Sequence, residues 1–247
     1  MTSTTNGDSG RSRRIALVTG GSRGIGRAIV ERLAARGMRV VFTYARDKAA
    51  ADAVAAACPG AVAVHADQSD LSCLDAMFAP VTGGLDVFVN NAAINPGAAI
   101  ADITPEDFDR VMTVNAKVPL LAMARAATLM RDGGRIVNIS TLNTVVPAPG
   151  HALYCASKAA LEQFTAVAAR ELGPRGITVN TVSPGATDTD LLRAVNTPEA
   201  LAQSAAFTAL GRLGHPADIA AVVAFLTTPD AAWLTGQNIR ATGGLLV

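Results

Sequence analysis

A short apolar run, a glycine-rich turn and a helical pattern follow one another near the start of the chain. Residues 15–18 are Ile-Ala-Leu-Val, residues 19–26 are Thr-Gly-Gly-Ser-Arg-Gly-Ile-Gly, and apolar residues then recur at Ile29, Leu33 and Ala34. An apolar run of this kind is typical of a strand buried on both faces in a parallel sheet. The order of strand, turn and helix therefore predicts an α/β fold that begins with a nucleotide-binding unit.

The glycines of this turn have distinct physical uses in such a unit. One permits a positive φ, one lets the backbone approach a diphosphate, and one allows the helix to pack closely on the strand. The amino end of the helix would supply N–H groups and a positive dipole to the phosphates. A purely structural turn is the alternative. The residues expected to bind a cofactor here are Gly20, Ser22, Arg23, Gly24, Ile25 and Gly26.

The end of a second apolar strand, residues 40–44, is where a dinucleotide-binding unit reads the adenine ribose. An acidic residue there would indicate NAD, whereas this chain has Tyr44 and Arg46 at that end and Arg23 in the glycine turn. Two guanidinium groups can hold a 2′-phosphate, so the sequence favours NADP(H). The alternative is two solvated arginines, with Asp47 neutralising part of the Arg46 charge.

Strand and helix patterns keep alternating along the rest of the chain. The expected strands are 61–65, 85–89, 135–139, 176–182 and 238–241, and the expected helices include 48–57, 154–172 and 217–226. Parallel strands end at one edge of an open sheet, so polar or small residues just after them are candidate ligand contacts. Those residues are Asp67, Gln68, Asn91 and Ala92. Asp67 has the alternative role of capping the next helix, and the asparagines can tie neighbouring loops together.

Tyr154 and Lys158 are four residues apart in the 154–172 helix, so they share one face, one turn apart. A cation beside a phenol favours the phenolate, which predicts that Lys158 lowers the pKa of Tyr154 toward a useful range for proton transfer. The hydroxyl of Thr141 or of Ser140 would hold a substrate oxygen. An ordinary helix with a half-buried tyrosine and a lysine that reaches solvent is the alternative.

The chain has 247 residues, of which 50% are apolar and 17% charged, and this composition suits one large α/β domain. Residues 1–14 lack hydrophobic periodicity and are expected to be a disordered tail, so the domain is expected to span 15–247. Residues 187–207 form an Ala- and Thr-rich insertion at the ligand edge of the sheet. Such an insertion would suit a substrate lid.

The net charge of +1 offers no basic surface for nucleic acid or an anionic membrane. No apolar segment reaches the roughly 18 residues of a membrane span, and residues 1–14 lack the apolar core of a signal peptide. We therefore expect a cytoplasmic protein. Cys58, Cys73 and Cys155 show no metal-ligand spacing with the histidines, so we expect reduced thiols and no metal site.

From about residue 15 onward the chain resembles the short-chain dehydrogenase/reductase family, and most of all its bacterial 3-oxoacyl-[acyl-carrier-protein] reductases. The resemblance rests on motifs in the family's order: Thr19-Gly20-x-x-x-Gly24-x-Gly26, Asn90-Asn91-Ala92, Asn115, Tyr154-x-x-x-Lys158 and Pro184-Gly185. It implies a single-domain Rossmann fold, a doubly wound, seven-stranded parallel sheet with helices on both faces. It also implies a nicotinamide cofactor and a homotetramer or homodimer.

By this resemblance, Tyr154 is the acid or base, Lys158 holds the nicotinamide ribose and Asn115 supports a water relay. The substrate-orienting hydroxyl of the family lies 13 residues before the tyrosine, where this chain has Thr141, with Ser140 as the alternative. Ala93 replaces the glycine that is usual after Asn-Asn-Ala. The residues implied to face the nicotinamide are Pro184, Gly185, Thr187 and Thr189.

Together these features predict NADPH-dependent reduction of a small-molecule ketone to a secondary alcohol. Two alternatives remain, namely NAD-dependent oxidation of a secondary alcohol and a dinucleotide-binding regulator without catalysis. The absence of an acid directly after Tyr44 opposes the first, and the complete set of Asn115, Tyr154 and Lys158 opposes the second. The substrate pocket is expected to comprise Leu142, Asn143, Val145, Val146, His151 and residues 187–207.

Overall fold

The computed structural model describes residues 13–194 and 196–245. Seven parallel strands form one sheet in the order β3-β2-β1-β4-β5-β6-β7, which confirms the predicted doubly wound Rossmann fold. The strand order reverses between β1 and β4, and ligands of such sheets bind outside the carboxyl ends of the strands at that point. The strands are β1 (Ile15–Val18), β2 (Arg39–Tyr44), β3 (Val62–His65), β4 (Leu85–Asn90), β5 (Met130–Ile139), β6 (Thr178–Pro184) and β7 (Asn238–Ala241).

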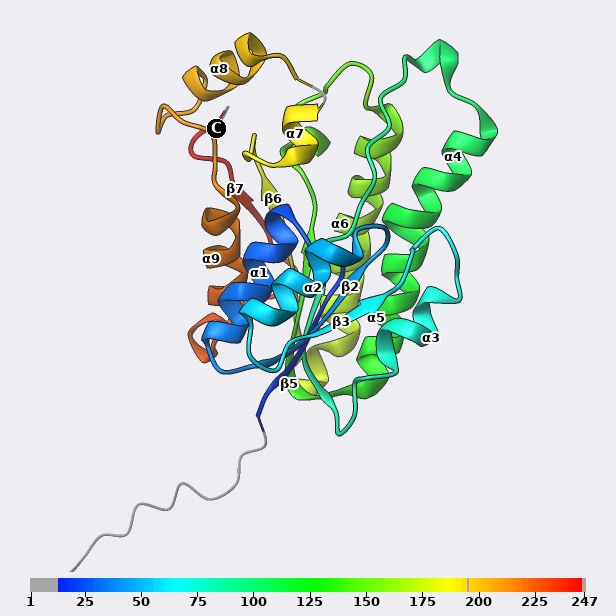
Figure 1. Ribbon diagram of the computed structural model, residues 1–247, viewed down its shortest axis with the longest axis vertical. Helices are drawn as coiled ribbons and strands as arrows, with labels where there is room; N and C mark the ends of the chain where they lie inside the picture. The colour runs from blue at the N-terminus through cyan, green and yellow to red at the C-terminus, as the bar shows by residue number, and fades with distance from the viewer. Residues whose placement is uncertain (1–12, 195, 246–247) are drawn as a thin grey trace, which may run out of the picture.

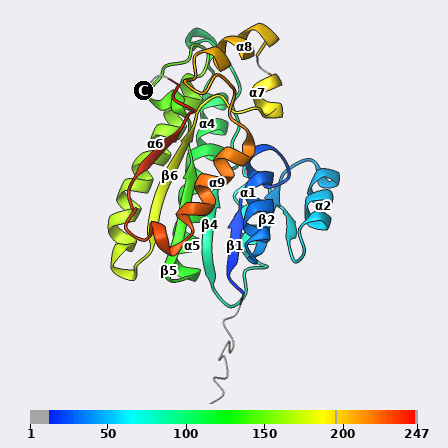
Figure 2. The same cartoon turned by 90° about the vertical axis from the view of Figure 1, so that its left-hand side faces the viewer.

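Helices cover both faces of the sheet (Figures 1 and 2). One face carries α1 (Gly24–Ala35), α2 (Lys48–Ala57) and α9 (Pro216–Leu226), and the other carries α3 (Cys73–Phe78), α4 (Pro105–Met112), α5 (Val118–Leu129) and α6 (Ala152–Leu172). A π-helical turn, Thr113–Lys117, joins α4 to α5, and 3-10 turns cover Ile100–Asp102, Leu142–Thr144, Gly173–Arg175 and Pro229–Ala231. Figure 1 places α7 (Asp190–Ala194) and α8 (Pro198–Ala206), both from the 187–207 insertion, beyond the carboxyl ends of the strands.

Side chains of each central strand alternate between two apolar cores. In β1, Ala16 and Val18 pack with residues of α1 and α9, whereas Ile15 and Leu17 pack with residues of α3 and α5. Both faces of the sheet are covered, so both sets of side chains are buried. This double burial is the reason that the central strands are continuous apolar runs in the sequence.

Local chemistry sets the ends of several helices. α2 begins where the Asp47 carboxylate accepts a hydrogen bond from Ala50 N at 2.8 Å. α4 begins where Thr104 Oγ1 accepts one from Asp107 N at 3.1 Å, with Pro105 in the first helical position. α6 ends at Leu172, before Gly173 and a proline, as the sequence predicts.

Two strands have bounds that differ by several residues from the prediction. β5 begins at Met130 rather than at 135, because Met130 already pairs with Leu85 before the register shifts. β6 begins at Thr178 rather than at 176, because Gly176 closes the preceding turn with a φ of +66°. β6 also continues to Pro184, which pairs with Ala241. The loop predicted to face the nicotinamide therefore leaves directly from the edge of the sheet.

The predicted disordered tail lies largely outside the described residues, which begin at Arg13. Arg13 Nε donates to Gly37 O at 2.7 Å, and Arg14 Nη1 donates to Thr227 O at 3.0 Å. Within residues 13–194 and 196–245, no helix is both long and apolar enough to cross a membrane. The same residues contain no group of acidic, histidine or cysteine side chains arranged to hold a metal ion.

Candidate active site

The glycine turn between β1 and α1 closes tightly on itself. Gly20 and Gly24 have φ values of +67° and +55°, which L side chains rarely adopt. A Cβ on Gly26 would lie 2.0 Å from Gly20 O and 2.5 Å from Asn91 Nδ2, so only glycine fits there. The backbone is thereby left bare on the side where a diphosphate would approach, and the turn fits such a group.

The amino end of α1 is not capped by its own chain. Arg23 occupies the N-cap position without a side-chain hydrogen bond to the helix, and the first turn has no acidic residue. The first helical N–H groups and the positive end of the helix dipole consequently remain available to an anion. This is the second feature of the turn that fits a dinucleotide phosphate.

Asn91 ties the end of β4 to the glycine turn. Its Nδ2 donates to Thr19 O at 2.9 Å and to Gly20 O at 3.1 Å, as expected for an asparagine that joins two loops. Thr19 Oγ1 in turn accepts from the backbone N–H groups of Asn91 and Ala92 at 2.9 and 3.0 Å. Sequence reasoning assigned no role to Thr19, although its place between β1 and the first glycine was the available signal.

Arg46 is exposed just beyond the end of β2. Asp47 is used as the cap of α2, and in the described part of the chain no ion pair involves Arg23 or Arg46. Asp47 therefore makes no contact ion pair with Arg46, and both arginines are exposed to solvent, so the choice between a 2′-phosphate site and two solvated arginines stays open. Tyr44 lies edge-on to His65, with ring centroids 5.5 Å apart, so its ring borders the same strand ends.

Asp67 and Gln68 follow β3 but face different surroundings. Asp67 Oδ1 accepts from both the backbone N–H and the hydroxyl of Ser69, each at 2.9 Å, which makes a local turn rather than a helix cap. Gln68 is buried, and its Nε2 donates to Val114 O at 2.8 Å. The Gln68 side chain thus braces the π-helical turn, and its role as a cofactor contact stays a prediction.

α6 brings Tyr154 and Lys158 together as predicted. Lys158 Nζ lies 5.9 Å from the centroid of the Tyr154 ring and donates to Ile139 O, at the end of β5, at 2.8 Å. The lysine side chain is only 2% exposed. Burial lowers the pKa of Lys158 to about 8, while the nearby Glu162 carboxylate raises it by a smaller amount.

The pKa of Tyr154 moves in the direction opposite to the prediction. Burial raises the pKa of the phenol to about 12, and a side-chain hydrogen bond with Thr141 only partly offsets this. The net shift is therefore opposite to the predicted one, and Lys158 is not among the groups that lower the pKa of Tyr154 here. The physical reason is that the ammonium group is directed at the Ile139 carbonyl, and loss of water around the phenol outweighs other effects.

The structure separates the two candidate hydroxyl groups at the end of β5. Ser140 Oγ donates to Glu162 Oε1 at 2.6 Å, so it is already bound to a carboxylate. Thr141 Oγ1 accepts from Asn143 N at 3.2 Å, and the same hydroxyl lies close enough to the Tyr154 phenol to lower the pKa of that group. Thr141 is therefore the hydroxyl beside the phenol. Sequence reasoning missed Glu162, although its position four residues after Lys158 placed it on the same helix face.

Asn115 lies in the π-helical turn and is fully buried. Its Oδ1 accepts from Ile94 N at 2.9 Å, while its Nδ2 donates to Ile94 O at 2.8 Å and to Ser157 Oγ at 3.1 Å. Single π-helical turns are frequent at functional sites because they redirect a side chain within a helix. Here the turn aims Asn115 between the loop after β4 and the helix that carries Tyr154.

The loop after β6 closes the site from the other side. Thr187 is buried and its Oγ1 donates to Gly185 O at 3.0 Å, while Gly185 N donates to Ala241 O at 3.1 Å. Thr189 Oγ1 accepts from Leu192 N at 3.2 Å, at the start of α7. A Cβ on Gly24 would lie 3.4 Å from Thr189 Cγ2, so the insertion touches the glycine turn. The residues predicted to contact the nicotinamide and the phosphates thus lie together at the carboxyl ends of the strands.

The match to known proteins extends over almost the whole chain. Residues 20–246 match the family model described as enoyl-(acyl carrier protein) reductase. A short-chain dehydrogenase/reductase from Serratia marcescens is 39% identical, with a TM-score of 0.89 over 95% of this chain and 98% of that chain. This chain belongs to the short-chain dehydrogenase/reductase family. The resemblance inferred from its motifs is confirmed.

Two other members of this oxidoreductase family bear on the chemistry. A 3-oxoacyl-[acyl-carrier-protein] reductase of Synechocystis sp. is 37% identical over 95% of this chain and 97% of its own length. The angucycline C-6 ketoreductase LanV, solved with bound NADP, is 41% identical, with a TM-score of 0.88 over 94% of this chain and 95% of LanV. The similarity therefore reaches enzymes whose names denote reduction of a keto group.

Replacing Lys158 with Met should make this short-chain dehydrogenase/reductase more stable while removing a functional group. Lowering the pKa from its ordinary value of 10.5 to about 8 means that burying the charge costs about 3 kcal/mol at pH 7. After loss of the bond to Ile139 O, we expect a net gain of about 2 kcal/mol in the free energy of unfolding.

The stability difference between Lys158→Met and the wild type should depend on pH. Between pH 8 and 10.5 the unfolded chain holds the Lys158 proton and the folded chain has lost it, so wild-type stability rises with pH there. The advantage of Lys158→Met should consequently shrink above pH 8. Urea unfolding at several pH values measures the difference in the free energy of unfolding between the variant and the wild type. Replacement of the exposed Lys117 with Met is the control. A variant less stable than the wild type at pH 7 would contradict the expectation.

Proposed function

We propose that this chain reduces a ketone to a secondary alcohol with NADPH. One arrangement carries the proposal: the Tyr154 phenol and the Thr141 hydroxyl lie together at the sheet edge that also holds the uncapped glycine turn. A 3-oxoacyl-[acyl-carrier-protein] reductase and the NADP-bound ketoreductase LanV among the similar proteins support the reaction class.

Tyr154 is the proton donor in this proposal. A pKa of about 12 keeps the phenol protonated at neutral pH. A protonated group can give its proton to a carbonyl oxygen that gains negative charge, as reduction requires. Oxidation of an alcohol would instead require the phenolate, which the same burial disfavours. The protonated state of Tyr154 is therefore compatible with its role as a proton donor.

The remaining groups orient the reactants. Thr141 would hold the carbonyl oxygen beside Tyr154, and Lys158 would hold the nicotinamide ribose. Asn115 supports a water relay that returns the proton to Tyr154. When bound, NADPH supplies the hydride, and the chain contributes orientation and the proton.

Thr141 and Ser140 provide a matched test of this assignment. Thr141→Val keeps the shape but removes the hydroxyl, so kcat/KM should fall about 10²-fold, as for loss of one group that binds a developing oxyanion. Thr141→Ser keeps the hydroxyl and should retain most activity. Ser140→Ala removes the partner of Glu162 and should cost less than Thr141→Val. The reverse order in steady-state kinetics would assign the role to Ser140.

The cofactor preference rests on Arg23 and Arg46. Arg23 is exposed at the N-cap of α1 and Arg46 is exposed just after β2, and Asp47, the acid next to Arg46 in sequence, caps α2. A 2′-phosphate has the charge and the planar pairs of oxygens that guanidinium groups bind bidentately. The adenine ribose of NAD offers no such charge.

Fluorescence titration with NADPH and NADH tests the cofactor and the proposed function together. The wild type should prefer NADPH, and Arg46→Ala should lose at least about tenfold in NADPH affinity, close to 1.4 kcal/mol, with NADH affinity unchanged. Arg32→Ala, an exposed arginine late in α1, is the control and should change neither affinity. Equal or tighter NADH binding by the wild type would instead favour NAD-dependent alcohol oxidation.

The insertion supports a substrate with an apolar body. Leu191 in α7, and Phe207 and Leu210 just after α8, are 46%, 59% and 67% exposed, close to the edge where Tyr154 lies. His151, another residue of the expected substrate pocket, has its Nδ1 at 2.9 Å from Asn95 Oδ1 and would offer a polar anchor. We propose that residues 187–207 close over the substrate as a lid.

The proposal includes a cytoplasmic homo-oligomer, a homotetramer or homodimer. Apolar side chains on α4, α5 and α6 remain exposed on the outer face of the molecule, and such patches mark association surfaces. They are Phe108, Leu120, Leu121 and Val167, which are 49%, 38%, 40% and 55% exposed.

A further inference from the structure

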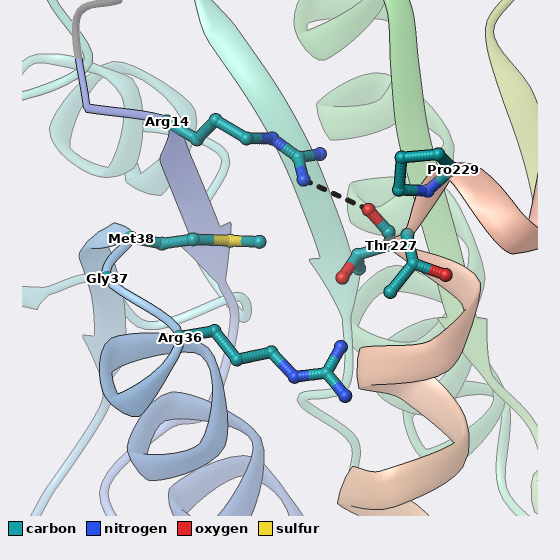
Figure 3. A pocket seen from close by; sticks show the side chains of 7 residues that line it. Arg14, Arg36, Gly37, Met38, Thr227 and Pro229 are labelled. Atoms are coloured by element: carbon teal, nitrogen blue, oxygen red, sulfur yellow. Dashed lines mark hydrogen bonds between the residues drawn. The ribbon is translucent and has the colours of Figure 1, made fainter. Parts of the chain in front are cut away.

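A groove crosses the amino-terminal edge of the sheet, opposite the edge that carries the active site. Two adjoining cavities, of about 240 Å³ and about 390 Å³, share Arg14, Thr227 and Pro229 in their walls. In the first, Arg14 and Arg36 extend side by side, with Met38 between them, toward Thr227 and Pro229 (Figure 3). We term this region the arginine groove, defined by Arg14, Arg36, Arg131 and Arg135.

The arginine groove carries more positive than negative charge. Asp86 is the carboxylate that lines it, and Asp86 Oδ2 already accepts from Arg131 Nη1 at 2.6 Å and from Ile15 N at 2.7 Å. Within the described residues, no ion pair involves Arg14, Arg36 or Arg135. Most of the guanidinium charge in the groove therefore has no counter-charge.

Backbone carbonyl groups balance part of the positive charge in the arginine groove. Arg36 Nη1 donates to Ala224 O at 2.6 Å and Arg14 Nη1 to Thr227 O at 3.0 Å, both at the carboxyl end of α9. Cations are favourable there, but a helix end supplies only about half of one negative charge. Two full positive charges exceed the negative charge at that end of α9. Each of the two guanidinium groups uses only one of its nitrogens in its hydrogen bond to the helix end.

Arg135 is the least satisfied member of the groove. It is only 8% exposed, and its Nη1 donates to Gly133 O, Gly134 O and Gly176 O at 2.5, 2.9 and 3.4 Å. Its Nε is buried and has no acceptor within the described residues. Burial, and then the charge of Arg14, lower the pKa of Arg135. A buried cation beside a like charge is an unfavourable arrangement, and the negative charge of an anion in the groove would relieve the repulsion.

We propose that the arginine groove binds a small phosphate-bearing anion between Arg14 and Arg135, with Arg36 as a further contact. A phosphate group carries up to two negative charges and several acceptor oxygens, which matches two or more guanidinium groups better than a single carboxylate does. The cavities are large enough for one or two phosphate groups. This site is separate from the cofactor phosphate contacts at Arg23 and Arg46, on the opposite edge of the sheet.

Calorimetric titration of the full chain with inorganic phosphate, and separately with pyrophosphate, tests the site. The wild type should bind pyrophosphate with a dissociation constant below about 1 mM at low ionic strength. Arg14→Gln should weaken binding at least about tenfold, since it removes a charged hydrogen-bond donor from the shared wall. Arg36→Gln is a second variant, and thermal unfolding checks that both variants fold.

Pyrophosphate titration in the presence of saturating NADPH distinguishes the two phosphate sites, because the cofactor would occupy the glycine turn as well as the contacts at Arg23 and Arg46. Pyrophosphate binding should stay within about twofold of its value without the cofactor if the groove is the site. Binding that is lost in the presence of NADPH but kept in Arg14→Gln would place the anion at the glycine turn and overturn the proposal. If titration of the wild type with phosphate and with pyrophosphate gives no heat of binding, the proposal is overturned as well.

Discussion

Tyr154→Phe is expected to reduce ketone turnover about 10³-fold, within the range for loss of a general acid. The substitution removes one oxygen atom and keeps the ring, so α6 and its packing should be unchanged. The loss should appear in kcat, because the proton is needed as the carbonyl is reduced. NADPH-dependent reduction of a panel of ketones, followed by absorbance of the reduced cofactor, measures it.

Cofactor binding separates the loss of a proton donor from a damaged site. Tyr154→Phe should bind NADPH within about twofold of the wild type, since the phosphate contacts lie in the glycine turn and at Arg46. Its thermal unfolding should also be unchanged. Substantial residual turnover, above a tenth of the wild-type rate, would show that another group donates the proton.

Gly26→Ala is expected to destabilise the fold strongly, although it adds a single methyl group. The new Cβ would lie 2.0 Å from Gly20 O and 2.5 Å from Asn91 Nδ2, and neither neighbour can yield without breaking the turn. We expect a loss of about 3 kcal/mol in the free energy of unfolding, as for severe overpacking. For a domain of this size that corresponds to a fall in Tm of roughly 6–12 °C.

Gly173→Ala is the matched control for this experiment. Gly173 has helical backbone angles, with a φ of −51°, and a Cβ there would meet no atom within 4 Å. This variant should be as stable as the wild type or slightly more stable, because alanine restricts the unfolded chain. Urea unfolding compares the two. Equal stability of Gly26→Ala and Gly173→Ala would mean that the turn can open, and would remove the reason for glycine at that position.

Elements with locally specified ends were predicted best. α2 has the predicted bounds, since Asp47 caps its first turn and Pro59 and Gly60 follow it. The starts of β5 and β6 were predicted less well. β5 starts where Met130 finds Leu85 as a partner, and a pairing between residues far apart in sequence leaves no signal in either segment alone.

The candidate active site shows the same difference between features set by neighbouring residues and features set by residues far apart in sequence. The four-residue spacing of Tyr154 and Lys158 is enough to place them together, because a helix relates such positions directly. The bond between Ser140 and Glu162 joins a strand end to a helix 22 residues later, and nothing in the sequence near Ser140 indicates it. That bond nevertheless decides which hydroxyl remains beside the phenol. The assignments of Asp67, Thr187 and Thr189 to the cofactor stay predictions.

The sequence by itself determined the order of strands and helices, the glycine turn, and the spacing that pairs Tyr154 with Lys158. These follow from periodicity and backbone sterics, which act over a few residues. Only the tertiary structure decided that Tyr154 has a raised pKa and that Arg14 and Arg135 lie in one groove. Desolvation and charge proximity depend on what the rest of the chain packs around a group, and no local pattern of residues contains that information.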